Sequence, residues 1–253
     1  MDNGKNILMK LKSKNLSKIK YKYLTFIPAR SGSKELKHKN LQKINGKTLL
    51  EHTINFIKKI NLKKNFIFVS TDSNKYSNLS KKLGAHSSFL RSKKNSSSTS
   101  LIDDAIFELL NHKNFLNYDF EILILLLPTQ PFRDPYNFKE GIKLISKKRI
   151  KSVISVKNLN RNTNYIFRMR SQRLLIKKNL KATNRQFIDS NYTPCGCFYL
   201  TKINSFKKFK SIFNVNNRGI ITQYPQNLDI DNKQDLYIAR IIMENKKKFN
   251  LNV

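Results

Sequence analysis

A basic stretch near the start of the chain holds the residues best suited to bind an anion. Gly32 stands between two serines there, so the backbone can turn tightly and direct its N–H groups at one anion. Arg30, Lys34 and Lys39 can neutralise a row of phosphates around that turn, and arginine offers two parallel donors. The glycine patterns of P-loops and of dinucleotide-binding folds are both absent. From its residues alone, the stretch is either a phosphate site or an ordinary surface turn.

The strands and helices expected from the sequence place this stretch at the edge of a sheet. Apolar runs of strand length alternate with segments whose apolar residues recur at helical spacing, which predicts one α/β domain of parallel strands and crossover helices. The expected strands are residues 23–29, 66–70, 122–127, 153–156, 197–200 and 219–223. The expected helices are marked by Leu50, Ile54 and Ile57, by Tyr76 and Leu79, by Ile102, Ile106 and Leu109, by Phe138, Ile142 and Ile145, and by Leu236, Ala239 and Ile242.

Ligands of such sheets bind beyond the carboxyl ends of the strands. By this rule, the candidate ligand-binding segments are residues 30–40, 71–72, 128–133 and the stretch around Asp229. We expect Asp72 to shape a turn or to cap a helix rather than to catalyse. Residues 157–193 are polar and rich in Asn and Arg, and we expect them to protrude from the domain as an insertion.

The net charge of +34 raises the question of a polyanionic partner. Lysines are scattered along every segment, and no basic stripe alternates with aromatic residues as a single-strand binding surface requires. We therefore interpret most of the charge as solvated surface lysine and expect no specific nucleic-acid partner. A nucleic-acid-binding protein is the alternative.

Cysteine content and hydropathy indicate a protein of the reducing cytoplasm. Cys195 and Cys197 lack the spacing of a zinc site and are too close in sequence to bridge each other easily, so we expect two buried thiols. No apolar run reaches the length of about 18 residues that spans a bilayer, and we expect no membrane association. Residues 1–22 are basic without an apolar core, which predicts an N-terminal arm before a single domain of residues 23–253.

Residues 27–34, which read IPARSGSK, and the Lys39-Asn40 pair that follows resemble the signature of the acylneuraminate cytidylyltransferases, the CMP-sialic acid synthetases. The resemblance continues in order through VSTD at residues 69–72, FLR at 89–91, PTQPFR at 128–133, RQ at 185–186, GCFY at 196–199 and DID at 229–231. It covers about residues 23 to 240 and implies a Rossmann-like, mostly parallel sheet with flanking helices and a small dimerisation insertion. It also implies a homodimer, CTP as a substrate and Mg²⁺ as a cofactor.

The resemblance assigns roles residue by residue. It implies that the triphosphate is held by Arg30, Ser33, Lys34, Lys39 and Asn40. Arg91 corresponds to an arginine that contacts the cytosine, and Ser100 lies near the positions at the base and ribose.

Asp229 and Asp231 correspond to the family's metal-binding Asp-x-Asp, and together with Arg30 and Lys34 they are the expected catalytic residues. Two carboxylates on one side of an extended segment suit a hard, oxygen-binding cation. The structural alternative is that Asp231 caps the helix expected to begin near Asn232.

The sugar is less well specified. Arg168 and Arg185 are candidates for holding its carboxylate, and Gln130 is a further candidate for binding it. This chain has Leu127, Gln130 and Cys195 where the family usually has Gln, Ser and Asn. N-acetylneuraminate, legionaminate and pseudaminate therefore all stay open. The Gly-Asp-Glu-Pro segment of the related deoxy-octulosonate enzymes is missing.

The implied reaction is attack by the sugar's anomeric hydroxyl on the α-phosphorus of CTP, with pyrophosphate as the leaving group. An aspartate of the pair or a metal-bound water would be the general base. An inactive, interaction-only relative is disfavoured because the basic loop is intact.

Overall fold

The apolar runs of the sequence form one six-stranded sheet in the order β10-β6-β9-β5-β1-β4. The computed structural model describes residues 18–159, 168–170, 173–175, 191–213, 216–249 and 251. The strands of this sheet are β1 (Ile19–Pro28), β4 (Asn65–Ser70), β5 (Tyr118–Leu125), β6 (Ser152–Asn158), β9 (Tyr192–Lys202) and β10 (Asn217–Ile221).

Most of these strands are parallel, as expected. β1 is parallel to both β4 and β5, and β10 is parallel to β6. β9 is the exception, because it lies antiparallel between β5 and β6. The residues of a Rossmann-like α/β sheet were thus predicted correctly, whereas the direction of β9 was not.

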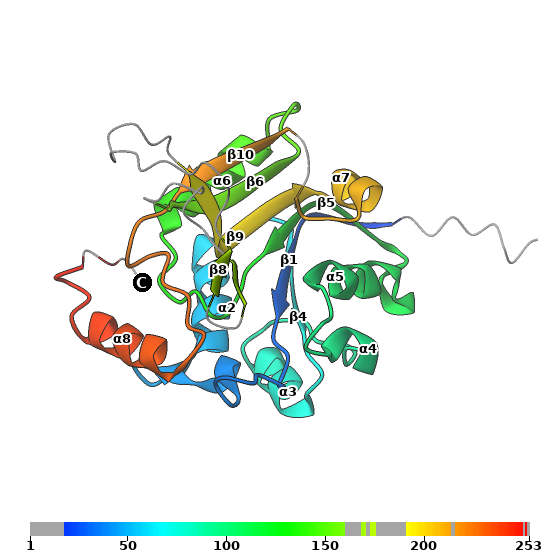
Figure 1. The fold of residues 1–253 in the computed structure, drawn as a ribbon. Helices are drawn as coiled ribbons and strands as arrows, with labels where there is room; N and C mark the ends of the chain where they lie inside the picture. The colour runs from blue at the N-terminus through cyan, green and yellow to red at the C-terminus, as the bar shows by residue number, and fades with distance from the viewer. Residues whose placement is uncertain are drawn as a thin grey trace, which may run out of the picture.

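Helices cover both faces of the sheet (Figure 1). Residues 23 and 27 of β1 face the side of α2 and α6, whereas residues 24 and 26 face the side of α5 and α7. This alternation is the two-residue period of a strand covered on both faces. The helices are α2 (Leu49–Ile60), α3 (Asn74–Lys82), α4 (Lys93–Ser96), α5 (Ile102–Asn111), α6 (Pro135–Ile145), α7 (Ile203–Phe209) and α8 (Lys233–Glu244), with short 3-10 turns η1 (Lys39–Leu41) and η2 (Lys113–Phe115).

A third apolar cluster brings the end of the chain to the basic stretch near its start. Leu236 and Ile242 of α8 pack with Leu36, Ile44 and Leu49. The small ladder of β2 (Lys43–Ile44) and β3 (Lys47–Thr48) supplies part of this surface. The packing positions residues 229–232 beside residues 30–40, which are almost two hundred residues away in the sequence.

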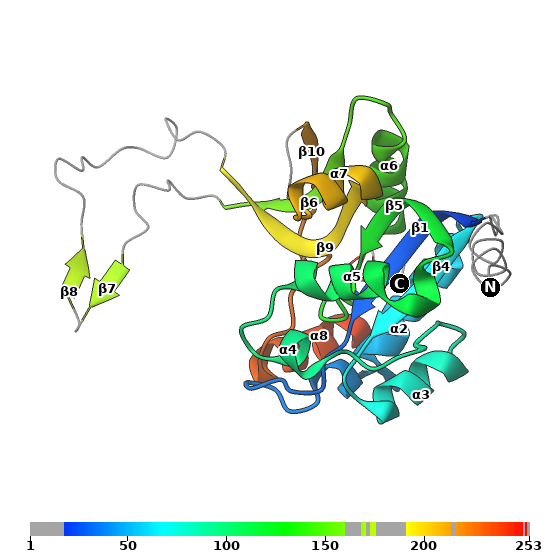
Figure 2. The same ribbon diagram turned by 90° about the vertical axis from the view of Figure 1, so that its right-hand side faces the viewer.

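The structure moves two of the expected boundaries. β1 begins at Ile19, so Ile19 to Lys22 belong to the sheet and not to the arm predicted for residues 1–22. β6 and β9 extend further than expected, so Lys157, Asn158, Tyr192 and Thr193 belong to the sheet and not to the insertion predicted for residues 157–193. Its described part is the ladder of β7 (Arg168–Arg170) and β8 (Arg173–Leu175), drawn away from the six-stranded sheet in Figure 2. Among the described residues, no helix has the length and apolar character needed to span a membrane.

Candidate nucleotide-binding site

A cavity of about 720 Å³ lies at the carboxyl ends of β1 and β5. Its wall comes from the stretch after β1, the residues before α5, the loop after β5, and Asp231. It gathers every residue predicted to bind the nucleotide, together with one of the predicted metal ligands: Arg30, Ser33, Lys34, Lys39, Asn40, Arg91, Ser100 and Asp231.

Asp72, which follows β4, holds the basic loop in shape. Its carboxylate accepts hydrogen bonds from the backbone N–H of Ser31 at 2.7 Å and from the Ser31 hydroxyl at 3.0 Å. Asn40 donates to the carbonyl of Arg30 at 3.0 Å, which ties the two ends of the loop together. Asp72 is therefore the turn-shaping residue that its position suggested. The loop does not use the conformational freedom of Gly32, whose φ is not in the left-handed region.

Arg91 is fixed rigidly on the wall of the cavity. Its Nε donates to the Ser70 hydroxyl at 2.9 Å, and its Nη2 donates to the Ser70 carbonyl at 2.8 Å. Burial lowers the pKa of Arg91 to about 10, which leaves the guanidinium charged at neutral pH. Such a buried, doubly anchored cation can present its remaining edge to a ligand with little loss of conformational entropy.

Arg30 and Ser100 are linked through the loop before α5. Arg30 Nη1 donates to the Ser97 carbonyl at 2.7 Å. The Ser100 hydroxyl donates to the same carbonyl at 2.9 Å and to that of Asn95 at 2.7 Å. These contacts hold the serine-rich segment against the basic loop, and Ser98, Thr99 and Leu101 line the cavity beside them. Sequence reasoning did not select these three residues, because a run of small polar residues is also typical of plain loops.

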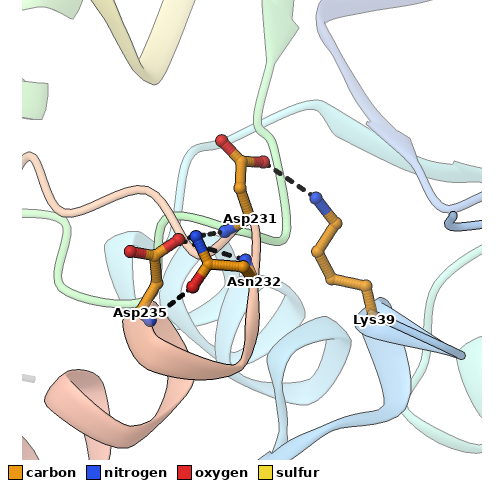
Figure 3. Close-up of polar contacts among 4 residues, drawn as sticks. All are labelled: Lys39, Asp231, Asn232 and Asp235. Atoms are coloured by element: carbon orange, nitrogen blue, oxygen red, sulfur yellow. Dashed lines mark hydrogen bonds and ion pairs between the residues drawn. The ribbon is translucent and has the colours of Figure 1, made fainter. Parts of the chain in front are cut away.

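Asp231 points away from the helix that follows it and pairs with Lys39 (Figure 3). The two side chains meet at 2.8 Å. The helix cap is Asn232, which accepts from the backbone N–H of Asp235, while the Asp235 carboxylate accepts from the N–H groups of Asp231 and Asn232. The structural alternative for Asp231 is therefore wrong, and its carboxylate, with 59% of the side chain exposed, is available to a cation.

Asp229 lies beside the cavity and not on its wall. Ile230 is fully buried in the third apolar cluster, so the aspartates on either side of it face away from that cluster. Burial raises the pKa of Asp229, and its Oδ1 is buried without a hydrogen-bond partner among the described residues. An orphaned carboxylate oxygen next to an exposed carboxylate fits a hard divalent cation. Among the described residues, no group of three acidic, His or Cys side chains forms a fuller metal site.

The described residues do not test the predicted sugar-binding residues as a group. Gln130 is fully buried, and its Nε2 has no hydrogen-bond partner among the described residues. The structure describes only the backbone of Arg168, in β7, and Arg185 lies outside the described residues. These three assignments stay predictions.

Arg133, at the end of the PTQPFR motif, is a buried support for the cavity wall. Its Nε donates to the Cys197 carbonyl at 2.6 Å, its Nη1 donates to the Thr53 hydroxyl at 3.3 Å, and its Nη2 donates to the Leu127 carbonyl. Burial lowers the pKa of Arg133 to about 10. The sequence offered no means of telling this arginine from one that binds a ligand.

Comparison with known proteins agrees with this geometry. The family model described as "Cytidylyltransferase" matches residues 24–246. A CMP-N,N'-diacetyllegionaminic acid synthase of Legionella pneumophila is 29% identical over 87% of this chain and 96% of its own length. An N-acylneuraminate cytidylyltransferase of Escherichia coli is also 29% identical, over 90% of this chain, and this match spans about half of the relative, 53%. A pseudaminic acid cytidylyltransferase of Campylobacter jejuni is 26% identical over 87% of this chain and 96% of its own length.

A solved structure has the same fold. The CMP:2-keto-3-deoxy-manno-octonic acid synthetase complexed with CTP aligns with a TM-score of 0.63 at 14% identity, covering 89% of this chain and 99% of its own. With the family model extending over nearly the whole described domain, the chain belongs to the cytidylyltransferase family.

Proposed function

We propose that this chain transfers CMP from CTP to a sialic-acid-like nine-carbon 2-keto sugar acid and releases pyrophosphate. The observation that carries the proposal is the single cavity in which three cationic side chains, the buried Arg91 and the exposed Asp231 meet. Relatives that are named for legionaminic, neuraminic and pseudaminic acids support the class of acceptor.

The cationic side chains would hold the triphosphate. Arg30, Lys34 and Lys39 come from the loop that Asp72 shapes, and they line the same cavity as Ser33 and Asn40. Arg91, anchored on Ser70 at the end of β4, would read the cytosine, since a rigid guanidinium edge can donate to a base carbonyl. Ser100 would lie near the ribose. In-line phosphoryl transfer depends mainly on such positioning and on stabilising charge on the phosphoryl oxygens.

Asp229 and Asp231 would hold Mg²⁺. The cation supplies charge neutralisation at phosphate oxygens when it is bound. A pair of protein carboxylates would suit Mg²⁺, which proteins commonly hold through one or two carboxylates. The ion pair with Lys39 keeps the Asp231 carboxylate directed at the cavity in the meantime.

The chemistry forms one bond and breaks one. The anomeric hydroxyl of the sugar attacks the α-phosphorus, and the bond from that phosphorus to the pyrophosphate oxygen breaks. The proton of the hydroxyl would pass to the general base, an aspartate of the pair or a water molecule. Arg30 and Lys34 would stabilise the negative charge that grows on the departing pyrophosphate. The product is a CMP-sugar, and the reaction would take place in the cytoplasm, where CTP is formed.

We further propose that the enzyme is a homodimer. The chain leaves β6 at Asn158 and enters β9 at Tyr192, both at the same end of the sheet as the cavity, and β7 and β8 lie between these points. We infer that an extension at this end of the sheet would reach the site of a second copy. Light scattering after gel filtration would show twice the chain's mass of 29.7 kDa.

One assay tests the proposed function. The full chain is incubated with CTP, Mg²⁺ and, in separate reactions, N-acetylneuraminate, legionaminate, pseudaminate and deoxy-octulosonate, and pyrophosphate release is followed. The proposal expects turnover with at least one nine-carbon acid and loss of turnover with EDTA. Turnover with deoxy-octulosonate alone, or with none of the acids, would refute it. For variants of the cavity aspartate Asp231, Asp119→Asn is the matched control, because Asp119 is exposed and does not line the cavity.

A further inference from the structure

Two thiols that the proposed reaction does not use lie side by side at the start of β9. Cys195 and Cys197 are both free and buried, with 5% and 1% of their surfaces exposed. Their sulfur atoms are 3.5 Å apart, and the sulfur of Cys195 is 3.0 Å from the hydroxyl oxygen of Thr222. Among the described residues, no carboxylate or imidazole completes a metal site around them.

The close approach of the sulfurs has a local cause. In a regular strand, residues i and i+2 lie on the same face but about 6.6 Å apart along the strand. Gly196, between the cysteines, has φ of 84°, and the pairing of β9 with β6 shifts register between Ile154 and Val156. The irregular backbone brings the two side chains together. The positive φ would strain any residue with a side chain, and a Cβ at position 196 would also approach Gln130 Nε2 and Leu127 Cδ1 closely, each at 3.2 Å, so this position favours glycine.

We propose that Cys195 and Cys197 form a reversible disulfide when the protein meets a hydroperoxide. The geometry requires no large motion, because the sulfurs are already in contact. The hydrogen bond between the sulfurs lowers the pKa of Cys195 and raises that of Cys197, which makes Cys195 the thiol that ionises first.

The steps balance with hydrogen peroxide as the oxidant. The Cys195 thiolate attacks one peroxide oxygen, the O–O bond breaks, and the departing hydroxide takes up a proton to become water. Cys195 is then a sulfenic acid. The Cys197 sulfur attacks the sulfenic sulfur, the S–O bond breaks, and the oxygen leaves as a second water with the thiol proton. Two electrons pass from the two sulfurs to the peroxide, and a reducing dithiol reverses the change.

Disulfide formation would change the shape of the cavity wall through the contacts that Cys197 makes. Its sulfur lies 3.5 Å from Gln130 Oε1, and its carbonyl accepts from Arg133, which also donates to the carbonyl of Leu127 on the cavity wall. Closing the sulfur–sulfur distance to about 2.05 Å must move one or both cysteines. This second part rests on the proposed function: we expect oxidation to slow CMP transfer about tenfold or more, since displacements near 1 Å at a site can cost more than that.

The first test needs no catalytic activity. The native full chain is treated with hydrogen peroxide, quenched with catalase, alkylated in denaturant and weighed by mass spectrometry. Because the chain has only two cysteines, the disulfide appears as an unalkylated protein lighter by two hydrogens, and dithiothreitol should restore both alkylation sites. Treated protein that is still alkylated at both cysteines would overturn the proposal, whether or not oxygen has been added elsewhere in the chain. So would a covalent dimer on a non-reducing gel.

The second test measures the consequence. CMP transfer by the oxidised wild type should fall and should recover with dithiothreitol, whereas Cys195→Ser and Cys197→Ser should keep their rates through the same treatment. Equal inhibition of the two variants would show that damage elsewhere is responsible. An oxidised enzyme that keeps full activity would refute the link to the cavity. If no acceptor supports turnover, the proposed function fails, but the mass measurement still decides whether the disulfide forms.

Discussion

Replacing Asp231 by Asn should greatly lower the rate of CMP transfer and leave the stability of the fold almost unchanged. The substitution removes one charge and keeps the shape of the side chain. The ion pair with Lys39 is lost, but 59% of the Asp231 side chain is exposed, and exposed pairs contribute about 0 to 1 kcal/mol. The capping contacts of α8 use the backbone N–H of Asp231 and the side chains of Asn232 and Asp235, so the helix keeps its cap. The melting temperature should therefore change little.

The effect on catalysis should be far larger. A missing metal-bound carboxylate removes several kcal/mol of stabilisation from phosphoryl transfer, and about 2.7 kcal/mol corresponds to a hundredfold loss of rate. Pyrophosphate release, measured across a Mg²⁺ titration, should fall by at least about a hundredfold and should need more Mg²⁺. Asp119→Asn is the matched control: Asp119 is exposed and does not line the cavity, so this variant should leave both the stability and the Mg²⁺ requirement unchanged. Wild-type turnover of Asp231→Asn at saturating Mg²⁺ would remove Asp231 from the site.

Three further results are expected. Asp229→Asn should abolish Mg²⁺-dependent turnover yet leave the melting temperature equal or higher at neutral pH, because burial raises the pKa of Asp229 and so disfavours its charged form in the folded state. The difference in melting temperature between the variant and the wild type should vanish below about pH 3.9, the ordinary aspartate pKa, where Asp229 is protonated in both the folded and the unfolded state. A variant that melts at a lower temperature than the wild type at neutral pH would contradict this reasoning. Arg91→Ala should raise the KM for CTP more than that for the sugar and should relax the preference over UTP; a change in the sugar's KM alone would show that Arg91 does not read the base. Deletion of residues 1–17 should leave CMP transfer unchanged, and duplex DNA should bind weakly, with affinity collapsing between about 50 and 200 mM salt. Tight, sequence-selective binding that is lost with the arm would favour the nucleic-acid alternative.

The sheet was largely predictable because its strands are continuous apolar runs. Residues 122–127 were expected as a central strand, and β5 occupies most of that range in the middle of the sheet. The direction of β9 was not predictable, since an apolar run carries no information on which way it crosses a sheet. The start of β1 at Ile19 was missed because its first residues are mostly polar and exposed, so they lack an apolar pattern.

Many of the residues that line the candidate site were predicted from the sequence, but most of the residues that hold them in place were not. The motifs identified the cationic side chains that line the cavity, because the family signature contains basic residues at those positions. The sequence did not show that Asn232 rather than Asp231 caps α8, since both residue types are good caps. Nor could it show that Arg133 is buried, because burial of a charged residue depends on partners distant in sequence, here Cys197 and Thr53.

The reversed direction of β9 has a consequence for how such an enzyme can change its acceptor. Between two parallel strands, the connection leaves the carboxyl end of one strand and must run back along the sheet to the amino end of the next. Because β9 is antiparallel to β6, the chain leaves the sheet after Asn158 and re-enters it at Tyr192, at the same end of the sheet as the cavity. Residues 159–191 are therefore a cassette that begins and ends at the end of the sheet where the cavity lies. Exchanging this cassette between relatives should alter the choice of sugar while the strands, the phosphate loop and the nucleotide contacts stay in register.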